Sequence, residues 1–124
     1  KKLDDKETMV VGITAPAVRV AIGEEFGMPA GSLVTGKMYG AMREAGFEIL
    51  DNNFLADLTI MEEASELVHR ITNGGTLPMM TSCSPGWIKY VETFYPEFVE
   101  NLSSCKSPQQ MMGAVIKSCF AEMQ

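Results

Sequence analysis

The sequence has no run of about 18 apolar residues and no signal-peptide pattern, so we expect neither a membrane span nor secretion. Basic residues are few: ten Lys and Arg stand against sixteen Asp and Glu, which gives a formal net charge of −6. Because phosphate binding requires clustered cations, this balance argues against nucleic acids and anionic membranes as partners. The three cysteines are widely spaced, which argues against a disulfide framework. These absences predict a cytoplasmic protein in a reducing environment.

The motifs of several common enzyme classes are also missing. There is no GxGxxG and no GxxxxGK(S/T), so phosphate-loop nucleotide binding is not supported. His69 is the single histidine and there is no GxSxG, so no Ser-His-Asp triad can be assigned. Cys105 and Cys119 have no CxxC partner and no His or carboxylate at ligand spacing, which makes a zinc site of the ordinary Cys/His type improbable.

What the sequence does contain is enough for one globular domain. Its 124 residues are 46% hydrophobic and 21% charged, and a chain of this length can bury a substantial core. The charged residues 1–8 are predicted to be a flexible end, and residues 9–124 a single α/β domain. The chain starts at Lys1 and stops at Gln124 within a helical pattern, so we expect it to be a fragment of a longer protein.

Strand and helix signals alternate along the chain. Short apolar runs predict strands at 9–14, 47–51 and 77–81. Helices are predicted over 17–26, 31–45 and 55–73, and two more begin at Ser84-Pro85 and Ser107-Pro108. This order predicts an α/β fold, a three-layer sandwich around a short, mostly parallel sheet.

Apolar residues at helical spacing predict which helix faces pack in the core. In the helix over 55–73 this face consists of Ile60, Ala64, Leu67, Val68 and Ile71. After Ser84 it consists of Trp87, Val91, Phe94, Tyr95 and Phe98, and after Ser107 of Met112, Val115, Ile116 and Cys119.

The best candidate site is the predicted strand exit at 81–84, because parallel sheets form binding sites at the carboxyl ends of their strands. Cys83 there directly precedes a predicted helix, whose first N–H groups and dipole favour a thiolate. Cys83 is therefore a candidate thiolate, metal ligand or proton carrier. The alternative is a small buried residue beneath a turn.

A second candidate is a charged group on the helix over 55–73. Glu63, Glu66 and Arg70 occupy spacings i, i+3 and i+7. Glu63 borders the apolar face, where a carboxyl group can have a raised pKa and pass protons. For Glu66 and Arg70 the residues alone favour an exposed ion pair worth about 0.3–0.5 kcal/mol. Solvated charges are the stronger interpretation of this group on those grounds.

Two long motifs resemble the catalytic domain of iron-only hydrogenases. Residues 81–87, Thr-Ser-Cys-Ser-Pro-Gly-Trp, are similar to that family's TSCCPGW motif. Residues 103–110, Ser-Ser-Cys-Lys-Ser-Pro-Gln-Gln, are similar to its SSxKSPQQ segment. Residues 14–19, 23–27 and 59–64 also match the family in the right order, so the resemblance covers residues 9–122.

The resemblance implies reversible reduction of protons to hydrogen at an H-cluster, a 4Fe–4S cubane joined to a two-iron subcluster. Cys83 resembles the cysteine that passes protons to the bridging dithiolate of the two-iron subcluster. Other residues match positions of the family's proton path, namely Glu63, Glu66, Arg70 and Ser103. A further set matches positions that line the two-iron subcluster, namely Ala15, Pro16, Pro108 and Gln109.

The sequence departs from the family at the cubane. Ser84 stands where the family has its second cysteine, a cubane ligand, and serine is a poor ligand for iron–sulfur clusters. Either Cys83 takes over that role, or ligation is weakened, or Ser84 was introduced. The family's other ligands lie in MPCxxK and CxxxC motifs that are absent from these residues. We therefore expect the chain by itself to hold no cluster and to be inactive.

The resemblance also implies partners: the missing C-terminal lobe of the same protein and an electron-transfer module linked to ferredoxin or NAD. Helix faces that meet that lobe would be exposed and apolar without it, so we expect self-association. Two alternatives to an enzyme remain, a hydrogenase-like factor of cytosolic iron–sulfur assembly and a sensory hydrogenase. Retention of Cys83, Glu63, Glu66 and Ser103 favours the enzyme, whereas Ser84 counts against full activity.

Overall fold

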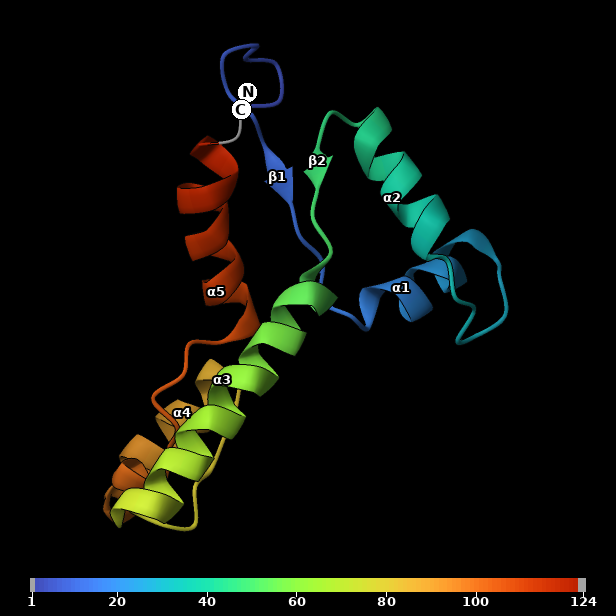
Figure 1. Ribbon diagram of the computed structural model, residues 1–124. Helices are drawn as coiled ribbons and strands as arrows, with labels where there is room; N and C mark the ends of the chain where they lie inside the picture. The colour runs from blue at the N-terminus through green and yellow to red at the C-terminus, as the bar shows by residue number, and fades with distance from the viewer. Residues whose placement is uncertain (1, 123–124) are drawn as a thin grey trace. The chain divides into compact units, whose positions relative to one another are not determined.

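The computed structural model describes residues 2–122 and divides the chain into two compact units, residues 1–53 and 54–124. Figure 1 shows the elements of both units along the chain. The boundary falls near the start of the long helix α3, Asn52–Asn73. The ends of the predicted segments at residues 1, 123 and 124 lie outside the described residues.

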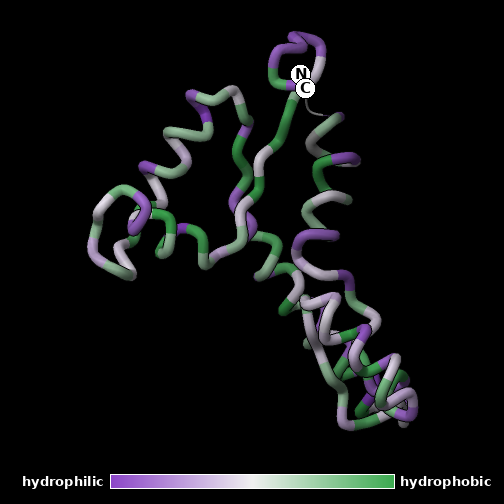
Figure 2. The backbone as a smooth tube through the Cα atoms, turned by 180° about the vertical axis from the view of Figure 1, so that it is seen from behind, coloured by the Kyte–Doolittle hydropathy of each residue, from purple (hydrophilic) through white to green (hydrophobic). Residues whose placement is uncertain are grey.

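A two-stranded parallel sheet organises unit 1. Strand β1, Val11–Gly12, pairs with β2, Glu48–Ile49, and the helix α2, Thr35–Glu44, precedes β2 and packs on it. The chain around both strands is largely hydrophobic (Figure 2). A Cβ at Gly12 would lie 2.7 Å from the terminal methyl of Met42, so a larger residue there would require the Met42 side chain to shift. The predicted α/β class with a short parallel sheet is confirmed.

The predicted helix over 17–26 is present in two parts. Helix α1, Val18–Ala21, continues as the 3₁₀ helix η1, Ile22–Phe26, which ends at Gly27 with φ of 72°. The next helix was predicted from residue 31, but α2 begins four residues later because Gly31, with φ of 75°, lies in a turn. Between these helices and β2 lies an apolar cavity of about 640 Å³, lined by side chains that include Val18, Ile22, Phe26, Met38 and Met42.

Unit 2 contains α3 and the helices that follow it. The helix α4, Pro85–Phe94, is succeeded by the 3₁₀ helix η2, Pro96–Asn101. The helix α5, Pro108–Val115, continues into the π-helical turn η3, Ile116–Phe120. Within residues 2–122, no helix is both long enough and apolar enough to cross a membrane.

The predicted third strand at 77–81 is wrong. Only Met80 pairs there, in an isolated parallel bridge with Leu102. Met80 N–H donates to Asn101 O and Ser103 N–H donates to Met80 O, each at 2.7 Å. Pro78 has no N–H to extend the ladder, and its carbonyl is taken by the Asn101 side chain at 2.7 Å. This bridge nevertheless fixes the segment before α4 against the segment before α5.

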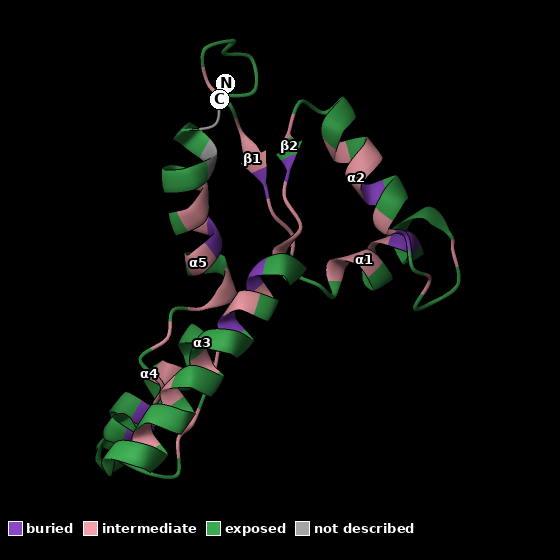
Figure 3. Cartoon of the chain, viewed as in Figure 1, coloured by how far each residue is buried: buried purple, intermediate pink, exposed green. Residues whose placement is uncertain are grey.

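The predicted packing face of α3 is also wrong within this chain. Ile60, Val68 and Ile71 are each 61% exposed, and most of α3 is exposed in Figure 3. The side of α3 that faces the rest of unit 2 carries Leu55 and Thr59, which are both buried. It continues with half-buried polar residues, namely Glu63, Glu66 and Arg70. Helical periodicity distinguishes two faces of α3. The more apolar face is exposed, and the more polar face is the one that the rest of the chain covers.

The other two predicted apolar faces are only partly buried. On the face after Ser84, Val91 is buried whereas the aromatic side chains are exposed, and the regular helix ends at Phe94. On the face after Ser107, Met112 is buried and Cys119 is exposed. The aromatic residues instead contact one another, as in the pair Tyr90 and Phe94 with ring centroids 5.1 Å apart.

Candidate functional site

The candidate site lies in unit 2, where α3 meets the segments that precede α4 and α5. Both segments end in helix caps, as the sequence predicts. Ser84 Oγ accepts a hydrogen bond from Trp87 N–H at 3.4 Å and caps α4. Ser107 and Gln110 form a capping box at the start of α5. These caps fix where each helix begins and therefore where the residues before it end.

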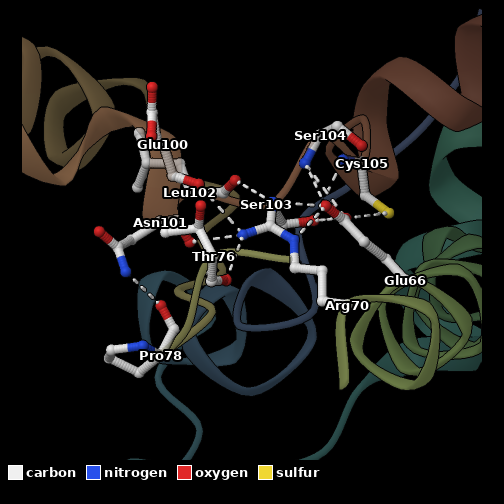
Figure 4. Close-up of polar contacts among 10 residues, drawn as sticks. All are labelled: Glu66, Arg70, Thr76, Pro78, Glu100, Asn101, Leu102, Ser103, Ser104 and Cys105. Atoms are coloured by element: carbon white, nitrogen blue, oxygen red, sulfur yellow. Dashed lines mark hydrogen bonds and ion pairs between the residues drawn. The ribbon is translucent and has the colours of Figure 1, made fainter. Parts of the chain in front are cut away.

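A closely bonded ion pair lies on the inner side of α3 (Figure 4). Arg70 Nη2 and Nε donate to Glu66 Oε1 at 2.6 Å and 3.0 Å. The two side chains are 14% and 16% exposed for Arg70 and Glu66 respectively. The expected exposed pair is therefore wrong, because the segment over 100–105 covers both side chains.

Glu66 also accepts hydrogen bonds from the segment before α5. Ser103 Oγ donates to Glu66 Oε2 at 2.6 Å, and Ser104 N–H donates to both carboxylate oxygens at 3.1 and 3.2 Å. Cys105 Sγ lies 3.6 Å from Glu66 Oε2. Cys105 N–H in turn donates to Ser103 Oγ at 3.1 Å, so the serine hydroxyl accepts one hydrogen bond and donates another.

Arg70 extends this network to backbone carbonyls. Its Nη2 donates to Leu102 O at 2.7 Å, and its Nη1 donates to three further carbonyls, of Thr76, Glu100 and Asn101, at 3.1–3.4 Å. An arginine remains protonated in proteins, so the side chain acts here as a fixed donor. It holds α3 to the end of η2 and to the turn after α3.

These contacts determine the protonation of two groups. Partial burial alone would raise the pKa of Glu66, but the hydrogen bonds from Ser103, Arg70 and Ser104 outweigh it and lower that pKa to about 2. Glu66 is therefore ionised at neutral pH. Burial is also the main cause that raises the pKa of Cys105, and the neighbouring Glu66 adds to it, so this thiol stays protonated.

A cavity of about 220 Å³ brings Glu63 and Cys83 into one wall. The lining combines a carboxylate, a thiol and several hydroxyl groups, with the apolar side chains of Ala56, Ile60 and Pro108. The hydroxyl groups are those of Thr59, Thr81, Ser82 and Ser107. Such a surface can hold water and pass a proton between a carboxylate and a thiol.

The structure thus gathers the candidate residues of unit 2 in two places. Glu63, Cys83 and Pro108 line the cavity, whereas Glu66, Arg70 and Ser103 form the network. Gln109 is exposed in the first turn of α5. Ala15 and Pro16 are exposed in unit 1, where Val18 N–H donates to Ala15 O at 3.1 Å. Ser84 is engaged as a helix cap.

Two residues of the site were not among the predicted ones. Cys105 has no carboxylate at ligand spacing in the sequence, but its thiol contacts Glu66, 39 positions away. Lys106, which lines the cavity beside Cys83, was not singled out. The available signal was their position inside the 103–110 motif, between a serine and a helix cap.

The donor groups do not fit an iron–sulfur cluster held by this chain alone. The three thiols belong to Cys83, Cys105 and Cys119. Across the described residues, no group of three or more Cys, His, Asp or Glu side chains is arranged to hold a metal ion. A 4Fe–4S cubane requires four thiolate ligands, so further ligands must come from elsewhere.

Comparison with known proteins identifies the chain's family. The model of the iron only hydrogenase large subunit, C-terminal domain, matches residues 8–124. This chain belongs to that family. Iron hydrogenase 1 of Clostridium pasteurianum is 54% identical over 119 residues, which cover 95% of this chain and 21% of that protein. The periplasmic [Fe] hydrogenase large subunit of Nitratidesulfovibrio vulgaris is 50% identical over 125 residues, which cover 98% of this chain and 30% of the relative.

Solved structures agree with this assignment. A variant of an [FeFe]-hydrogenase from Chlamydomonas reinhardtii superposes with a TM-score of 0.90 at 45% identity, over 98% of this chain and 32% of that one. The chain is also similar to proteins with other names: the cytosolic Fe-S cluster assembly factor narfl of Danio rerio is 29% identical over 131 residues, 100% of this chain and 32% of that protein. The chain spans about a fifth to a third of the length of the relatives it matches.

Proposed function

We propose that the chain forms the proton-conducting part of an iron-only hydrogenase that interconverts protons and hydrogen in the complete protein. The observation that carries this proposal is the position of Ser103, which donates to Glu66 at 2.6 Å while accepting from Cys105 N–H. The Cys105 N–H keeps its own proton and orients the hydroxyl, so Ser103 can pass its proton to Glu66 and take another from a water molecule. Glu63 and Cys83 share the wall of the cavity on the same unit.

Each residue of this route has a separate task. Glu66 stays ionised at one end, because its pKa is near 2, so it accepts hydrogen bonds there and carries a proton only transiently. Ser103 shares a hydrogen-bonded proton with Glu66, while Glu63 exchanges protons across the cavity with Cys83, the terminal thiol. Arg70 cannot release its proton at physiological pH, so it contributes by orienting Glu66. The cavity of about 220 Å³ provides room for the water that links a carboxylate and a thiol.

The cofactor proposed for the complete protein is the H-cluster, a 4Fe–4S cubane with a two-iron subcluster, which supplies the electron-transfer chemistry. Because the donor groups of this chain do not fit the cubane, the route proposed here ends at the Cys83 thiol. We propose that Ala15, Pro16, Pro108 and Gln109 line the two-iron subcluster. At the cubane, Cys83 or Ser84 is the ligand that we assign to this chain.

Three further proposals concern the chain's surroundings. It is inactive alone and requires the C-terminal lobe of the same protein for cluster ligands. In the complete protein, electrons arrive from a ferredoxin-linked or NAD-linked module in the cytoplasm. Without its lobe the chain self-associates, which is supported by the exposed apolar side chains of α3.

The test is a chimera in which residues 8–124 replace the matching segment of the Clostridium enzyme. We expect the matured chimera, with Ser84→Cys as a parallel form, to produce hydrogen and to show infrared bands of iron-bound CO and CN. Glu63→Gln should reduce the rate by roughly 10²-fold or more, since it removes a proton carrier. Glu62→Gln, an exposed neighbour on α3, is the matched control. Equal rates in both variants would contradict the route.

A role in iron–sulfur protein assembly is the second candidate, because relatives with that name match the chain. This role needs no proton route, so the chimera separates the two. A chimera that binds a 4Fe–4S cluster yet shows no CO or CN bands with either residue at position 84 favours the assembly role.

A further inference from the structure

Outside the proton route, Arg19 in unit 1 forms a hydrogen-bonded ion pair with Asp51. Its Nη2 donates to Asp51 Oδ1 at 2.9 Å and its Nη1 donates to Asp51 Oδ2 at 3.4 Å. The same Nη2 lies 3.3 Å from the Tyr39 hydroxyl, and the guanidinium carbon lies 6.0 Å from the centre of the Tyr39 ring. The side chain is only 12% exposed. It therefore joins α1, α2 and the end of β2.

Asp51 has a second task besides this ion pair. Its Oδ1 accepts a hydrogen bond from Asn53 N–H at 2.9 Å, in the first turn of α3. One carboxylate thus caps the helix that carries Glu63 and Glu66 and also binds Arg19. A capping carboxylate and a guanidinium fork are both directional, so Asp51 holds the Arg19 side chain beside the residues that follow β2.

Arg19 is placed to control the turn that follows β1. Ala15 O accepts from Val18 N–H at 3.1 Å, and Arg19 O accepts from Val34 N–H at 2.9 Å. The residue is thus held at its backbone by the loop before α2 and at its side chain by Asp51. The turn over 14–16 lies between this anchor and β1.

The same region contains polar atoms that the described residues do not pair. Thr14 Oγ1, Arg19 Nε and Asn52 Oδ1 are buried and have no hydrogen-bond partner within residues 2–122. Thr14 follows β1 and Asn52 follows β2, so two of these atoms lie beyond the carboxyl ends of the two strands. Buried polar groups are rarely left unpaired, which indicates a polar neighbour supplied from outside these residues.

We propose that Arg19 and Asp51 are positioning residues that hold the turn over 14–16 beside the end of β2 and thereby preorganise the cofactor-lining residues Ala15 and Pro16. This inference rests on the proposed function for the identity of the cofactor, and on the contacts above for the positioning itself. Arg19 and Asp51 exchange no proton with the route in unit 2. Their contribution is the geometry of a backbone segment.

Two variants separate the ion pair from the helix cap. Asp51→Asn keeps an oxygen that can accept from Asn53 N–H but removes the charge that binds Arg19. Arg19→Lys keeps the charge but removes the fork that spans Asp51 and Tyr39. Lys89→Gln breaks the exposed pair of Lys89 with Glu92 and is the matched control.

The first measurement is amide hydrogen exchange in the full chain without cofactor. We expect Val18 and Val34 amides to exchange about tenfold faster in both variants, with α3 amides unchanged in Asp51→Asn and no change in Lys89→Gln. Unchanged exchange at Val18 and Val34 would overturn the positioning role. If the full chain shows no protected amides, the same measurement on the chimera decides.

The second measurement is infrared spectroscopy of the matured chimera. We expect the CO and CN bands of Asp51→Asn to shift or broaden while the cubane content stays constant. Faster exchange with unchanged bands would overturn the role at the cofactor. Absence of bands in the parent chimera would overturn the proposed function and the cofactor part of this inference. The exchange result would then still decide whether the pair positions the turn.

Discussion

Ser103 Oγ lies 2.6 Å from Glu66 Oε2 although the two residues are 37 positions apart in the chain. The backbone of Ser103 is fixed independently, because its N–H donates to Met80 O at 2.7 Å. The hydroxyl therefore reaches the carboxylate from an anchored segment. Breaking this hydrogen bond tests the network without disturbing the bridge that positions it.

Ser103→Ala should raise the pKa of Glu66 from its value of about 2 by roughly one to two units, because a hydrogen bond to a charged group contributes about 1.5–3 kcal/mol. Ser104→Ala is the matched control, since Ser104 donates through its backbone N–H and the substitution leaves that donor in place. A carbon-13 NMR titration of the Glu66 carboxyl group measures both. Equal values in the two variants would show that the Ser103 hydroxyl does not stabilise the carboxylate.

Arg70→Gln should lower the free energy of unfolding by about 2–4 kcal/mol. It leaves Glu66 without its cation and several backbone carbonyls without a donor, and such groups are costly when half-buried. Urea denaturation provides the measurement. Lys89→Gln, in an exposed pair, should cost less than about 0.5 kcal/mol. Similar losses in the two variants would contradict a structural role for the Arg70 network.

Glu66 makes the stability of the chain depend on pH in a defined direction. Its pKa is lower in the folded state than the ordinary value of 4.5, so its contribution is fully present above that value and is lost as the pH falls toward about 2. The difference in unfolding free energy between the parent chain and Glu66→Gln should therefore be large at about pH 6 and shrink by about pH 3. A difference that is constant over this range would contradict the lowered pKa.

The sequence was sufficient to predict the helix boundaries that depend on local chemistry. Ser84-Pro85 and Ser107-Pro108 begin helices because a cap and a fixed φ act within one turn of the chain. The strands at 9–14 and 47–51 followed from two apolar runs separated by helices, and the structure pairs them in parallel. The family resemblance followed from the motifs at 81–87 and 103–110, which helix and strand propensities do not explain.

The parts that could not be predicted depend on contacts between distant segments. Nothing in the spacing of Glu66 and Arg70 shows that residues 100–105 cover them, so an exposed pair was the natural expectation. The apolar face of α3 was assigned to the core because burial was assumed to occur within the chain. A single bridge at Met80 replaced a predicted strand, because Pro78 cannot donate and its carbonyl bonds to Asn101 instead.

The exposed apolar face of α3 predicts that the isolated chain self-associates. Ile60, Val68 and Ile71 are each 61% exposed, and apolar surface of this kind drives contact between copies when no partner covers it. Light scattering of the isolated chain should give a mass above 13.6 kDa that rises with concentration. Ile60→Ser combined with Val68→Ser should shift the mass toward the monomer, whereas Thr72→Ser, an exposed polar change on the same helix, should not. A monomer at high concentration in the parent chain would contradict the proposal.

Position 84 decides how the chain contributes to an iron–sulfur cluster. Ser84 Oγ caps α4 through Trp87 N–H, and a hydroxyl is a weaker ligand for iron than a thiolate. After anaerobic reconstitution we expect almost no iron or acid-labile sulfide on the isolated chain, and no change with Cys83→Ala.

In the chimera, Ser84→Cys should raise the amount of bound iron because it restores a thiolate. The lost helix cap should lower the free energy of unfolding by about 1 kcal/mol. Cys83→Ala in that background should leave the iron content unchanged while it slows hydrogen production. If Cys83→Ala instead removes the iron, Cys83 is the ligand and the terminal proton carrier must be another group.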